Sequence, residues 1–437
     1  MKNTDKQLLK NLNLNKLMKR FLSLALAAGL VLGLQARELV TFPNAANNYQ
    51  LYPENNLPDV SQAPKGYENF HIEHYGRHGS RWLIGTHRHD GVIRMLEQGD
   101  SIGGLTERGR QILEEVRQAR KDLTNKEGEL SPKGAMQHRG IARRMYRNFP
   151  GVFKDGTYVN ARSTTIPRCI LSMSNAIVEL LGNEPGLKVD IDASEADHWY
   201  MKNVTDYPAI EAEKEGLKLY KKFHKANSTD GAYLAKLFNR PAEVAEVIDE
   251  ELMTEYLFDI AANSVSTGEQ SDIFNIFSPV ELDRIWRNQN AKWYIRSGNT
   301  PLTKGLVPLR QRFLLRNFIE SADSAIVSKN LSANLRYGHE VIVIPFVCLL
   351  ELNDYGKVYD NLDDLADNWH SYEIFPMACN VQMVFARPKK KNYTADDVLV
   401  KVLLNERPAK LPVPAVNGDY VRWKDLRAYY AKRIGME

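Results

Sequence analysis

The distribution of apolar and polar residues predicts several amphipathic helices. Apolar residues recur at helical spacing between residues 105 and 119, again from Ser131 to Arg147, and over a longer stretch from Leu306 to Val327. Ser131 and Pro132 suit the start of a helix, because a serine side chain caps the first turn and proline fits inside it. We interpret the first two of these helices as packing elements and assign them no chemistry.

Other segments read as strands or as buried helices. An apolar helix is expected over residues 341–352 and a terminal helix over residues 420–434. Five segments are expected as strands, namely 70–75, 157–164, 187–192, 376–387 and 398–405. The first of these alternates poorly between apolar and polar residues, so its pattern alone leaves the prediction undecided.

Two further regions differ in character from these segments. Residues 37–66 are rich in Asn and Pro and are expected to form an irregular surface arm without visible chemistry. Residues 199–301 are helix-rich and charged, with scattered aromatic side chains, and we interpret them as an inserted helical domain. The three cysteines, Cys169, Cys348 and Cys379, lie in or beside apolar runs and are expected to be buried small hydrophobic side chains.

The beginning of the chain has the pattern of a secretory signal peptide. Residues 1–36 contain six basic side chains and one acidic side chain, followed by an apolar run from Phe21 to Leu34 that is short for a membrane span. Removal of this segment changes the formal net charge from +4 to −1, because 52 basic and 53 acidic side chains remain. We therefore expect a periplasmic or secreted protein with no stable membrane anchor and no nucleic-acid partner. The oligomeric state stays open.

The candidate chemistry is concentrated between His74 and Trp82, where His78 stands between two arginines. The guanidinium groups of Arg77 and Arg81 can bind a phosphoryl group in a bidentate manner, and Gly79 allows the backbone to approach the ligand closely. Their positive charge disfavours the imidazolium form of His78, which leaves its ring free to attack phosphorus. This pattern predicts a phosphate-transfer site with His78 as the nucleophile.

The same region offers a competing interpretation as a metal site. Half of the ten histidines of the chain lie between residues 71 and 89, and imidazole is a common zinc ligand. No carboxylate or cysteine recurs there at ligand spacing, and the two arginines would repel a cation. We therefore expect no metal and no other cofactor.

Two distant segments complete the candidate site. Arg162-Ser163-Thr164 ends a predicted strand and is followed by Arg168, which opens a helix, while His339-Glu340 precedes the apolar helix that contains Pro345. Together with Arg77-His78-Gly79-Ser80-Arg81, these segments resemble the signatures of the histidine acid phosphatases, branch 2 of the histidine phosphatases. Within that family the chain looks most similar to the multiple inositol polyphosphate phosphatases. It departs from the pattern at Leu83, where a proline is usual.

The resemblance implies an α/β fold, with a central mixed sheet flanked by helices and an inserted all-helical cap. On this basis we expect a signal peptide over 1–36, an α/β core over 37–198 and 302–437, and a cap over 199–301. The implied catalytic residues are His78 and Glu340, and the implied phosphate-binding residues are Arg77, Arg81, Arg168 and His339. The carboxylate directly follows the histidine, as in the GHD form of the motif, but is Glu, as in the GHAE form.

The expected function is hydrolysis of small phosphate esters through a phosphohistidine intermediate. The resemblance favours an inositol polyphosphate such as phytate as the substrate, with sugar-phosphate or broad-specificity acid phosphatase activity as the alternative. Two other classes stay open at this point. One is a phospholigand-binding protein with weak turnover, suggested by the unusual position of Glu340, and the other is a metal-dependent hydrolase that uses the histidine cluster.

Overall fold

The computed structural model describes residues 37–437 except 204, 269–270, 329–330, 391 and 437. The expected signal peptide, residues 1–36, lies outside the described residues. All elements below belong to one compact unit from Val40 to Glu437. Within the described part of the chain, no helix combines the length and the apolar character that crossing a membrane requires.

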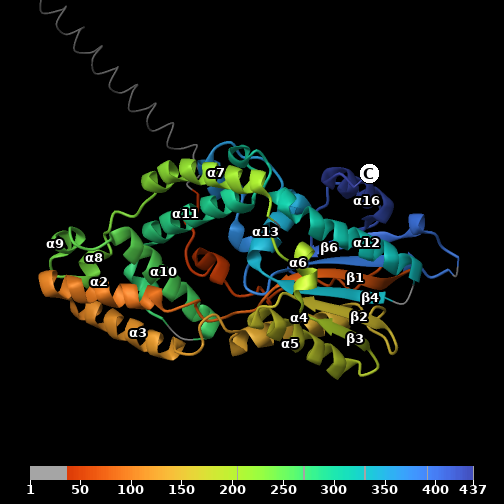
Figure 1. Cartoon of the computed structure of the whole chain (residues 1–437), viewed down its shortest axis with the longest axis horizontal. Helices are drawn as coiled ribbons and strands as arrows, with labels where there is room; N and C mark the ends of the chain where they lie inside the picture. The colour runs from red at the N-terminus through yellow and green to blue at the C-terminus, as the bar shows by residue number, and fades with distance from the viewer. Residues whose placement is uncertain (1–36, 204, 269–270, 329–330, 391, 437) are drawn as a thin grey trace, which may run out of the picture. The chain divides into compact units, whose positions relative to one another are not determined.

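A mixed eight-stranded sheet forms the centre of this unit (Figure 1). The strand order is β3-β2-β4-β1-β5-β6-β7, with β8 paired to β6. The first four strands in this order run parallel to one another, and the others pair antiparallel. The strand bounds are β1 (Tyr67–Arg77), β2 (Tyr158–Ser163), β3 (Lys188–Asp192), β4 (Leu331–Gly338), β5 (Asn380–Pro388), β6 (Leu399–Leu404), β7 (Arg407–Pro408) and β8 (Val421–Arg422).

The central position of strand β1 in the sheet explains why its sequence pattern was ambiguous. It lies between β4 and β5, and nine consecutive residues from Asn69 to Arg77 are buried. A strand covered on both faces does not need to alternate between apolar and polar residues. Some of its buried positions are therefore polar, and Glu73 forms an ion pair with Arg336 of β4 at 2.6 Å.

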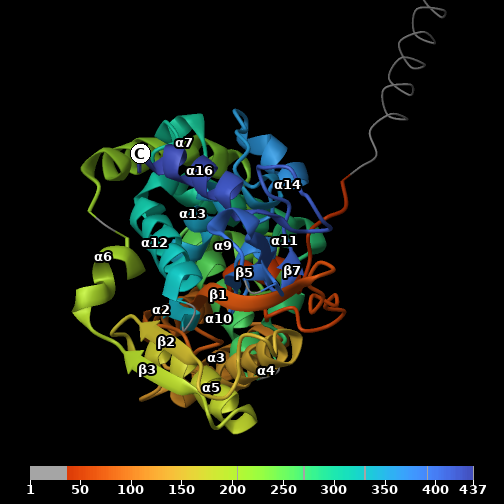
Figure 2. The same cartoon turned by 90° about the vertical axis from the view of Figure 1, so that its right-hand side faces the viewer.

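Helices cover both faces of the sheet. On one face lie α12 (Arg312–Ser328), α13 (Glu340–Leu349) and α16 (Trp423–Ile434), and on the other lie α4 (Pro132–Asn148) and α5 (Pro167–Asn183), as Figures 1 and 2 show. Each layer is closed by its own apolar core. Full burial of a large apolar side chain contributes about 1.5–3 kcal/mol, so these two cores supply much of the driving force for folding. The α/β fold class is confirmed.

The helix starts follow the local sequence, with one correction. Ser131 accepts a hydrogen bond from the backbone N–H of Gly134, and Pro132 lies in the first turn of α4, which confirms the predicted cap. The long helix expected from Leu306 to Val327 is wrong at its beginning. A 3₁₀ segment, η5 (Pro308–Gln311), precedes α12, because Pro308 lacks the N–H that a continuous α-helix would use at this point.

A third core belongs to a layer made only of helices. Most of its buried residues come from α2 (His87–Gly103), from α3 (Glu107–Leu123) and from segments between residues 233 and 286. The remaining helices are α6 (His198–Met201), α7 (Tyr207–Ala226), α8 (Leu234–Leu237), α9 (Pro241–Ala245), α10 (Glu250–Thr267), α11 (Pro279–Ser297), α14 (Leu365–Asn368) and α15 (Ser371–Ile374). The expected cap at 199–301 stays a proposed division, and α2 and α3 pack with it although they precede it in the sequence.

Short 3₁₀ helices connect these elements. They are η1 (Asn44–Tyr49), η2 (Glu195–Asp197), η3 (Ile273–Ile276), η4 (Pro301–Thr303), η6 (Leu352–Asp354), η7 (Leu362–Asp364) and η8 (Ala395–Asp397), in addition to η5. The first of them contradicts the expected irregular surface arm over residues 44–49. Ala45, Ala46, Asn47 and Tyr49 are buried, because η1 packs between α10, α11 and α15. This segment is therefore part of the interior.

Candidate active site

Three parallel strands end side by side and bring together the segments singled out in the sequence. Gly338 at the end of β4 is in register with Arg77 at the end of β1, and Ser163 at the end of β2 is in register with Tyr337 of β4. Since the carboxyl ends of parallel strands share one edge of a sheet, the loops that follow them meet there. His78 follows β1, His339 follows β4, and α5 with Arg168 follows β2.

The imidazole of His78 is held in a defined tautomer. Its Nδ1 lies 2.8 Å from the carbonyl oxygen of Gly79, which can only accept a hydrogen bond, so Nδ1 carries the proton and Nε2 has a free lone pair. The side chain is almost fully buried. Burial lowers the pKa of His78 well below 6.5, and the charges of Arg77 and Arg81 add to this, against the opposing effect of Glu340. The ring is therefore neutral and ready to act as a nucleophile.

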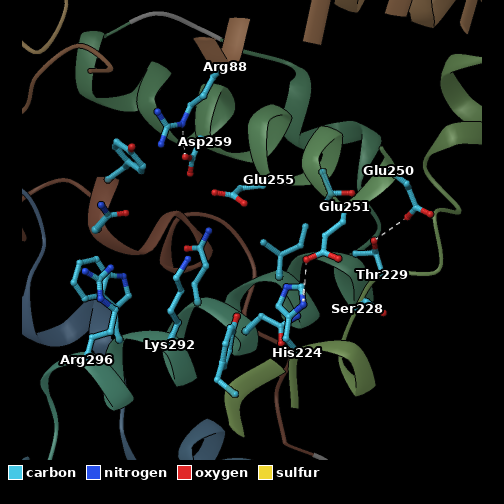
Figure 3. Close-up of a pocket in the computed structure, with 18 residues that line it drawn as sticks. Arg88, His224, Ser228, Thr229, Glu250, Glu251, Glu255, Asp259, Lys292 and Arg296 are labelled. Carbon is cyan, nitrogen blue, oxygen red and sulfur yellow. Dashed lines mark hydrogen bonds and ion pairs between the residues drawn. The ribbon is translucent and has the colours of Figure 1, made fainter. Parts of the chain in front are cut away.

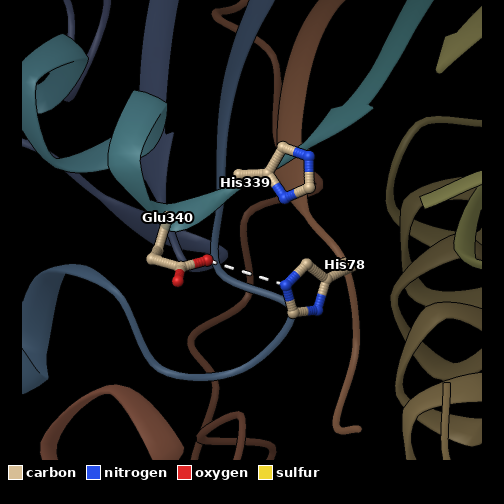
Figure 4. A group of neighbouring side chains, drawn as sticks. All are labelled: His78, His339 and Glu340. Atoms are coloured by element: carbon tan, nitrogen blue, oxygen red, sulfur yellow. Dashed lines mark ion pairs between the residues drawn. The ribbon is translucent and has the colours of Figure 1, made fainter. Parts of the chain in front are cut away.

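Glu340 is the first residue of α13, and its carboxylate faces His78 (Figure 4). Oε2 lies 3.6 Å from Nε2 of His78 and 3.1 Å from Nε of Arg77. Burial by itself raises the pKa of Glu340, but the charges of Arg77 and Arg81 outweigh it and hold the pKa well below 4.5. The helix N-terminus also favours a carboxylate at this position. With these neighbours alone, the group is ionised.

His339 directly precedes α13 and lies edge-on to His78, with 5.7 Å between the ring centroids. Its Nε2 is 3.3 Å from the hydroxyl oxygen of Thr164, and its backbone N–H points to the hydroxyl of Tyr75 at 3.4 Å. Burial lowers the pKa of His339 to about 4, although Glu340 opposes this shift. A neutral His339 can thus donate one hydrogen bond to a ligand.

Three arginines lie around the two histidines and Glu340. Each has an N–H donor without a hydrogen-bond acceptor among the other described residues. Arg77 is fully buried and donates Nη1 to the carbonyl oxygens of Asn48 at 2.7 Å and Phe375 at 2.9 Å, while its Nη2 has no partner in the described chain. The buried Nε atoms of Arg81 and Arg168 also lack partners among the described residues. Burial lowers the pKa of Arg168, and the nearby charge of Arg81 lowers it further. Such a cluster is built to receive an anion.

The backbone of the loop that carries His78 is fixed by two helices. Gly79 donates its N–H to the hydroxyl of Ser172 of α5 at 3.1 Å, and Ser80 donates its N–H to Oε1 of Gln137 of α4 at 2.9 Å. A Cβ atom on Gly79 would lie 2.5 Å from the carbonyl oxygen of Gly134, so no larger residue fits. The helix opening at 131–134, to which the sequence assigned only packing, therefore also supports the candidate nucleophile.

The η1 segment makes a second contribution that the sequence did not reveal. Asn48 accepts the hydrogen bond from Arg77, and the ring of Tyr49 lies 5.6 Å from the guanidinium carbon of Arg81. Burial raises the pKa of Tyr49 to about 12, so its ring carries no charge that would compete for the arginine. A carbonyl oxygen can be supplied by any residue, so no residue-type signal pointed to Asn48.

The structure offers a different set of possible metal ligands from the histidines between residues 71 and 89. One ligand atom each of His78, His339 and Glu340 lies within 4.8 Å of the others, a spacing that could accommodate a cation. The guanidinium of Arg77 lies 3.1 Å from the same carboxylate and would oppose it. The remaining members of the histidine cluster have other surroundings. His71, for example, contacts Glu73 at 2.7 Å within the sheet.

Comparison with known sequences identifies the family. The sequence model of the histidine phosphatase superfamily (branch 2) matches residues 77–405, most of the chain. The chain therefore belongs to this family and is a histidine-type phosphatase. Among curated proteins, no sequence matches.

Solved structures show the same fold at low sequence identity. The apo multiple inositol polyphosphate phosphatase of Bifidobacterium longum superposes with a TM-score of 0.70 and 18% identity, covering 89% of this chain and 97% of that one. The phytase of D. castellii gives a TM-score of 0.68 and 15% identity, over 90% and 85% of the two chains. A Hafnia alvei phytase in complex with tartrate gives 0.53 and 12%, over 85% and 98%.

Proposed function

We propose that this phosphatase is a metal-independent phosphomonoesterase that acts through a phosphohistidine on His78. One observation carries the proposal. An unprotonated, buried imidazole nitrogen lies 3.6 Å from a carboxylate and beside three arginines with unused donors. Nucleophile, proton carrier and anion-binding groups thus occur at one place, as phosphoryl transfer requires.

In the first step Nε2 of His78 attacks phosphorus, and the bond from phosphorus to the ester oxygen breaks. Glu340, in its carboxylic acid form, transfers its proton to the departing alkoxide. In the second step the Glu340 carboxylate takes a proton from a water molecule, whose oxygen attacks phosphorus. The bond between phosphorus and Nε2 breaks, and inorganic phosphate leaves with His78 neutral again.

The first step needs Glu340 in its acid form, so the bound substrate must raise the low pKa of this carboxyl group. The dianionic phosphate of the substrate would lie beside the carboxylate and engage Arg77, the group that now stabilises the ionised form. Both effects raise the pKa of Glu340 and favour the acid form that the first step needs. Arg77, Arg81, Arg168 and His339 would bind the phosphoryl oxygens and stabilise the charge of the transition state.

We propose that the substrate is an inositol phosphate such as phytate. The support is the fold shared with a multiple inositol polyphosphate phosphatase and phytases, of which the Bifidobacterium longum protein has also been solved with inositol hexasulfate and with phosphate. A sugar-phosphate or broad-specificity acid phosphatase is the alternative. A phospholigand-binding protein with weak turnover is the second alternative. Glu340 directly follows His339, as the carboxylate does in the GHD form of the motif, but it is a glutamate, as in the GHAE form.

We further propose that the enzyme is periplasmic or secreted. The support is the basic and apolar pattern of residues 1–36, which is typical of a secretory signal peptide. Expression of the full chain, followed by N-terminal sequencing of the product in the periplasm or medium, tests this proposal. An uncleaved product that stays in the cytoplasm would contradict it.

One assay separates the functional candidates. Phosphate release is measured from phytate and from an aryl phosphate, each with and without an exhaustive chelator. The proposal predicts turnover of both that is insensitive to the chelator. Turnover that is lost with the chelator and restored by zinc would indicate the metal-dependent hydrolase, and binding without multiple turnovers would indicate the phospholigand-binding protein.

A further inference from the structure

The ring nitrogen of His339 that faces away from the nucleophile is in contact with a hydroxyl group. Burial lowers the pKa of His339 to about 4, so the neutral ring carries one proton, on either Nδ1 or Nε2. Nε2 lies 3.3 Å from the hydroxyl oxygen of Thr164. Figure 4 shows Nδ1, the nitrogen next to the stem of the side chain, turned toward His78 and Glu340. The proton position on this ring therefore decides what the ring presents to the reacting groups.

Both partners of this contact are held in place by the strand ends. Thr164 is fully buried after β2, and its backbone N–H donates to the carbonyl oxygen of Tyr337 at 3.1 Å. The backbone N–H of His339 points to the hydroxyl of Tyr75 at 3.4 Å, and that hydroxyl donates to the carbonyl oxygen of Met201 at 3.0 Å. The hydroxyl of Thr164 and the ring of His339 thus meet at fixed positions.

The direction of the hydrogen bond follows from the groups that face Nδ1. One ligand atom each of His339, His78 and Glu340 lies within 4.8 Å of the others. The atoms on the His78 and Glu340 side are acceptors, namely a carboxylate oxygen and the lone pair of Nε2 of His78. They attract a proton on Nδ1 of His339 and repel a lone pair there. Nε2 of His339 then holds the lone pair and accepts a hydrogen bond from Thr164.

Cys169 is the second side chain in contact with this ring. Its Sγ lies 3.7 Å from Nε2 of His339 and 3.3 Å from the carbonyl oxygen of Gly338, which can only accept a hydrogen bond. Burial raises the pKa of Cys169 to about 12, so the thiol keeps its hydrogen and donates it to that carbonyl. A thiol sulfur is also a weaker acceptor than an imidazole nitrogen. Among these neighbours, Thr164 is left as the donor to Nε2.

We propose that Thr164 is a positioning residue that holds His339 in the tautomer with Nδ1 protonated, so that Nδ1–H donates to a phosphoryl oxygen of the substrate. In a neutral histidine, the hydrogen bond of one nitrogen sets the proton position on the other. The opposite tautomer would present a lone pair to the anion and remove one donor from the phosphate site. This inference rests on the proposed phosphatase function and adds a residue that acts through His339.

The test observes the ring of His339 directly, by nitrogen NMR of the intact enzyme with isotopically labelled histidines. His339→Gln assigns the resonances, because only those of this ring disappear. We expect a proton on Nδ1 in the wild type and in Thr164→Ser, which keeps the hydroxyl. Thr164→Val has nearly the same shape without it, so Nε2 loses its donor and the Nε2–H form should become populated.

Kinetic measurements on the same variants test the consequence for the anion. In Thr164→Val, inorganic phosphate should inhibit on the order of tenfold more weakly, and kcat/KM for an aryl phosphate should fall by a similar factor, as expected for one lost hydrogen bond to a charged group. Thr164→Ser should restore both quantities. A general disturbance of the fold would not be repaired by a hydroxyl group alone.

Thr229→Val provides the matched control. It removes a threonine hydrogen bond of the same length, 3.3 Å to Oε1 of Glu250, on the wall of a cavity of about 410 Å³ (Figure 3). None of the proposed catalytic and phosphate-binding residues lines this cavity. The tautomer of His339 and the inhibition by phosphate should therefore stay as in the wild type.

A proton on Nε2 in the wild type, or an unchanged tautomer in Thr164→Val, would overturn the inference. Equal effects in Thr229→Val would do the same. In each of these cases phosphate release by the wild-type enzyme would leave the proposed function intact. A wild-type enzyme that releases no phosphate would overturn the proposed function, and with it the role that we assign to Thr164.

Discussion

Replacement of Glu340 by glutamine separates the two roles that we give to its carboxylate. The change preserves the shape of the side chain but removes its negative charge and its capacity to transfer a proton. Loss of a general acid typically costs about 10²–10⁴-fold in rate, so we expect kcat for an alkyl phosphate to fall within this range. An aryl phosphate, whose leaving group scarcely needs a proton, should still give a fast first turnover followed by slow steady-state release.

The same substitution should strengthen the binding of inorganic phosphate. A phosphate in contact with Nε2 of His78 lies about 3–4 Å from it, and the carboxylate oxygen is 3.6 Å from the same nitrogen. Two like charges about 4 Å apart repel by about 4 kcal/mol at an effective dielectric constant near 20, and the nearby Arg77 offsets part of this. We therefore expect phosphate to inhibit Glu340→Gln on the order of tenfold more tightly than wild type.

Stopped-flow measurement of the aryl burst and steady-state assays with both esters and inorganic phosphate supply these quantities. The control is Glu320→Gln, which removes an exposed carboxylate of α12 from its pair with Arg316 and should change none of them. Equal and small losses for the alkyl and aryl esters, together with unchanged phosphate inhibition, would refute the reasoning. Glu340 would then only favour the start of α13.

Three further expectations concern the anion site, the metal and pH. Arg168→Ala should cost about 3–4 kcal/mol of transition-state stabilisation, measured as a loss of kcat/KM. Arg168→Lys should restore little of it, because an ammonium group does not replace a guanidinium fork. A normal kcat/KM in Arg168→Ala would exclude Arg168 from the site. Dialysis against a strong chelator should leave phosphate release unchanged, and a loss that zinc restores would show metal dependence. The lowered pKa of His78 means that the neutral nucleophile persists as the pH falls. After correction for ionisation of the substrate, kcat/KM for an aryl phosphate should stay level from about pH 7 to about pH 5.5, and a decline centred near 6.5 would contradict the depressed pKa.

The parts of the site that could be read from the sequence are those in which neighbouring residues act together. Arg77, His78 and Arg81 lie within five consecutive residues, so their residue types alone suggested phosphate chemistry. The roles of His339 and Glu340 followed only from the family resemblance. Arg168 needed the family resemblance, because a single arginine at a helix start has no specific pattern. The structure places it near Arg81, whose charge lowers the pKa of Arg168.

The parts that could not be read depend on contacts between distant segments. Gln137 and Ser172 lie on amphipathic helices, where the pattern indicates a buried face but not the loop that this face supports. Asn48 acts through its carbonyl oxygen, which is independent of residue type.

The same limit applies to the fold. The helical pattern of α3 was visible, but an amphipathic face does not specify its partner, so its packing with α2 and α8 was missed. Strand β1 was uncertain because burial on both faces removes the alternation that marks a strand.

The central claim is that His78 carries the phosphoryl group during turnover. Brief incubation with a labelled phosphate ester, followed by rapid denaturation, should trap phosphate on the wild-type protein in a form that is labile in acid and stable in alkali. Glu340→Gln should accumulate more of it with an aryl ester, and His78→Ala should contain none and show no turnover while keeping its circular dichroism spectrum. Full activity of His78→Ala, or the same labelling in that variant, would contradict the account.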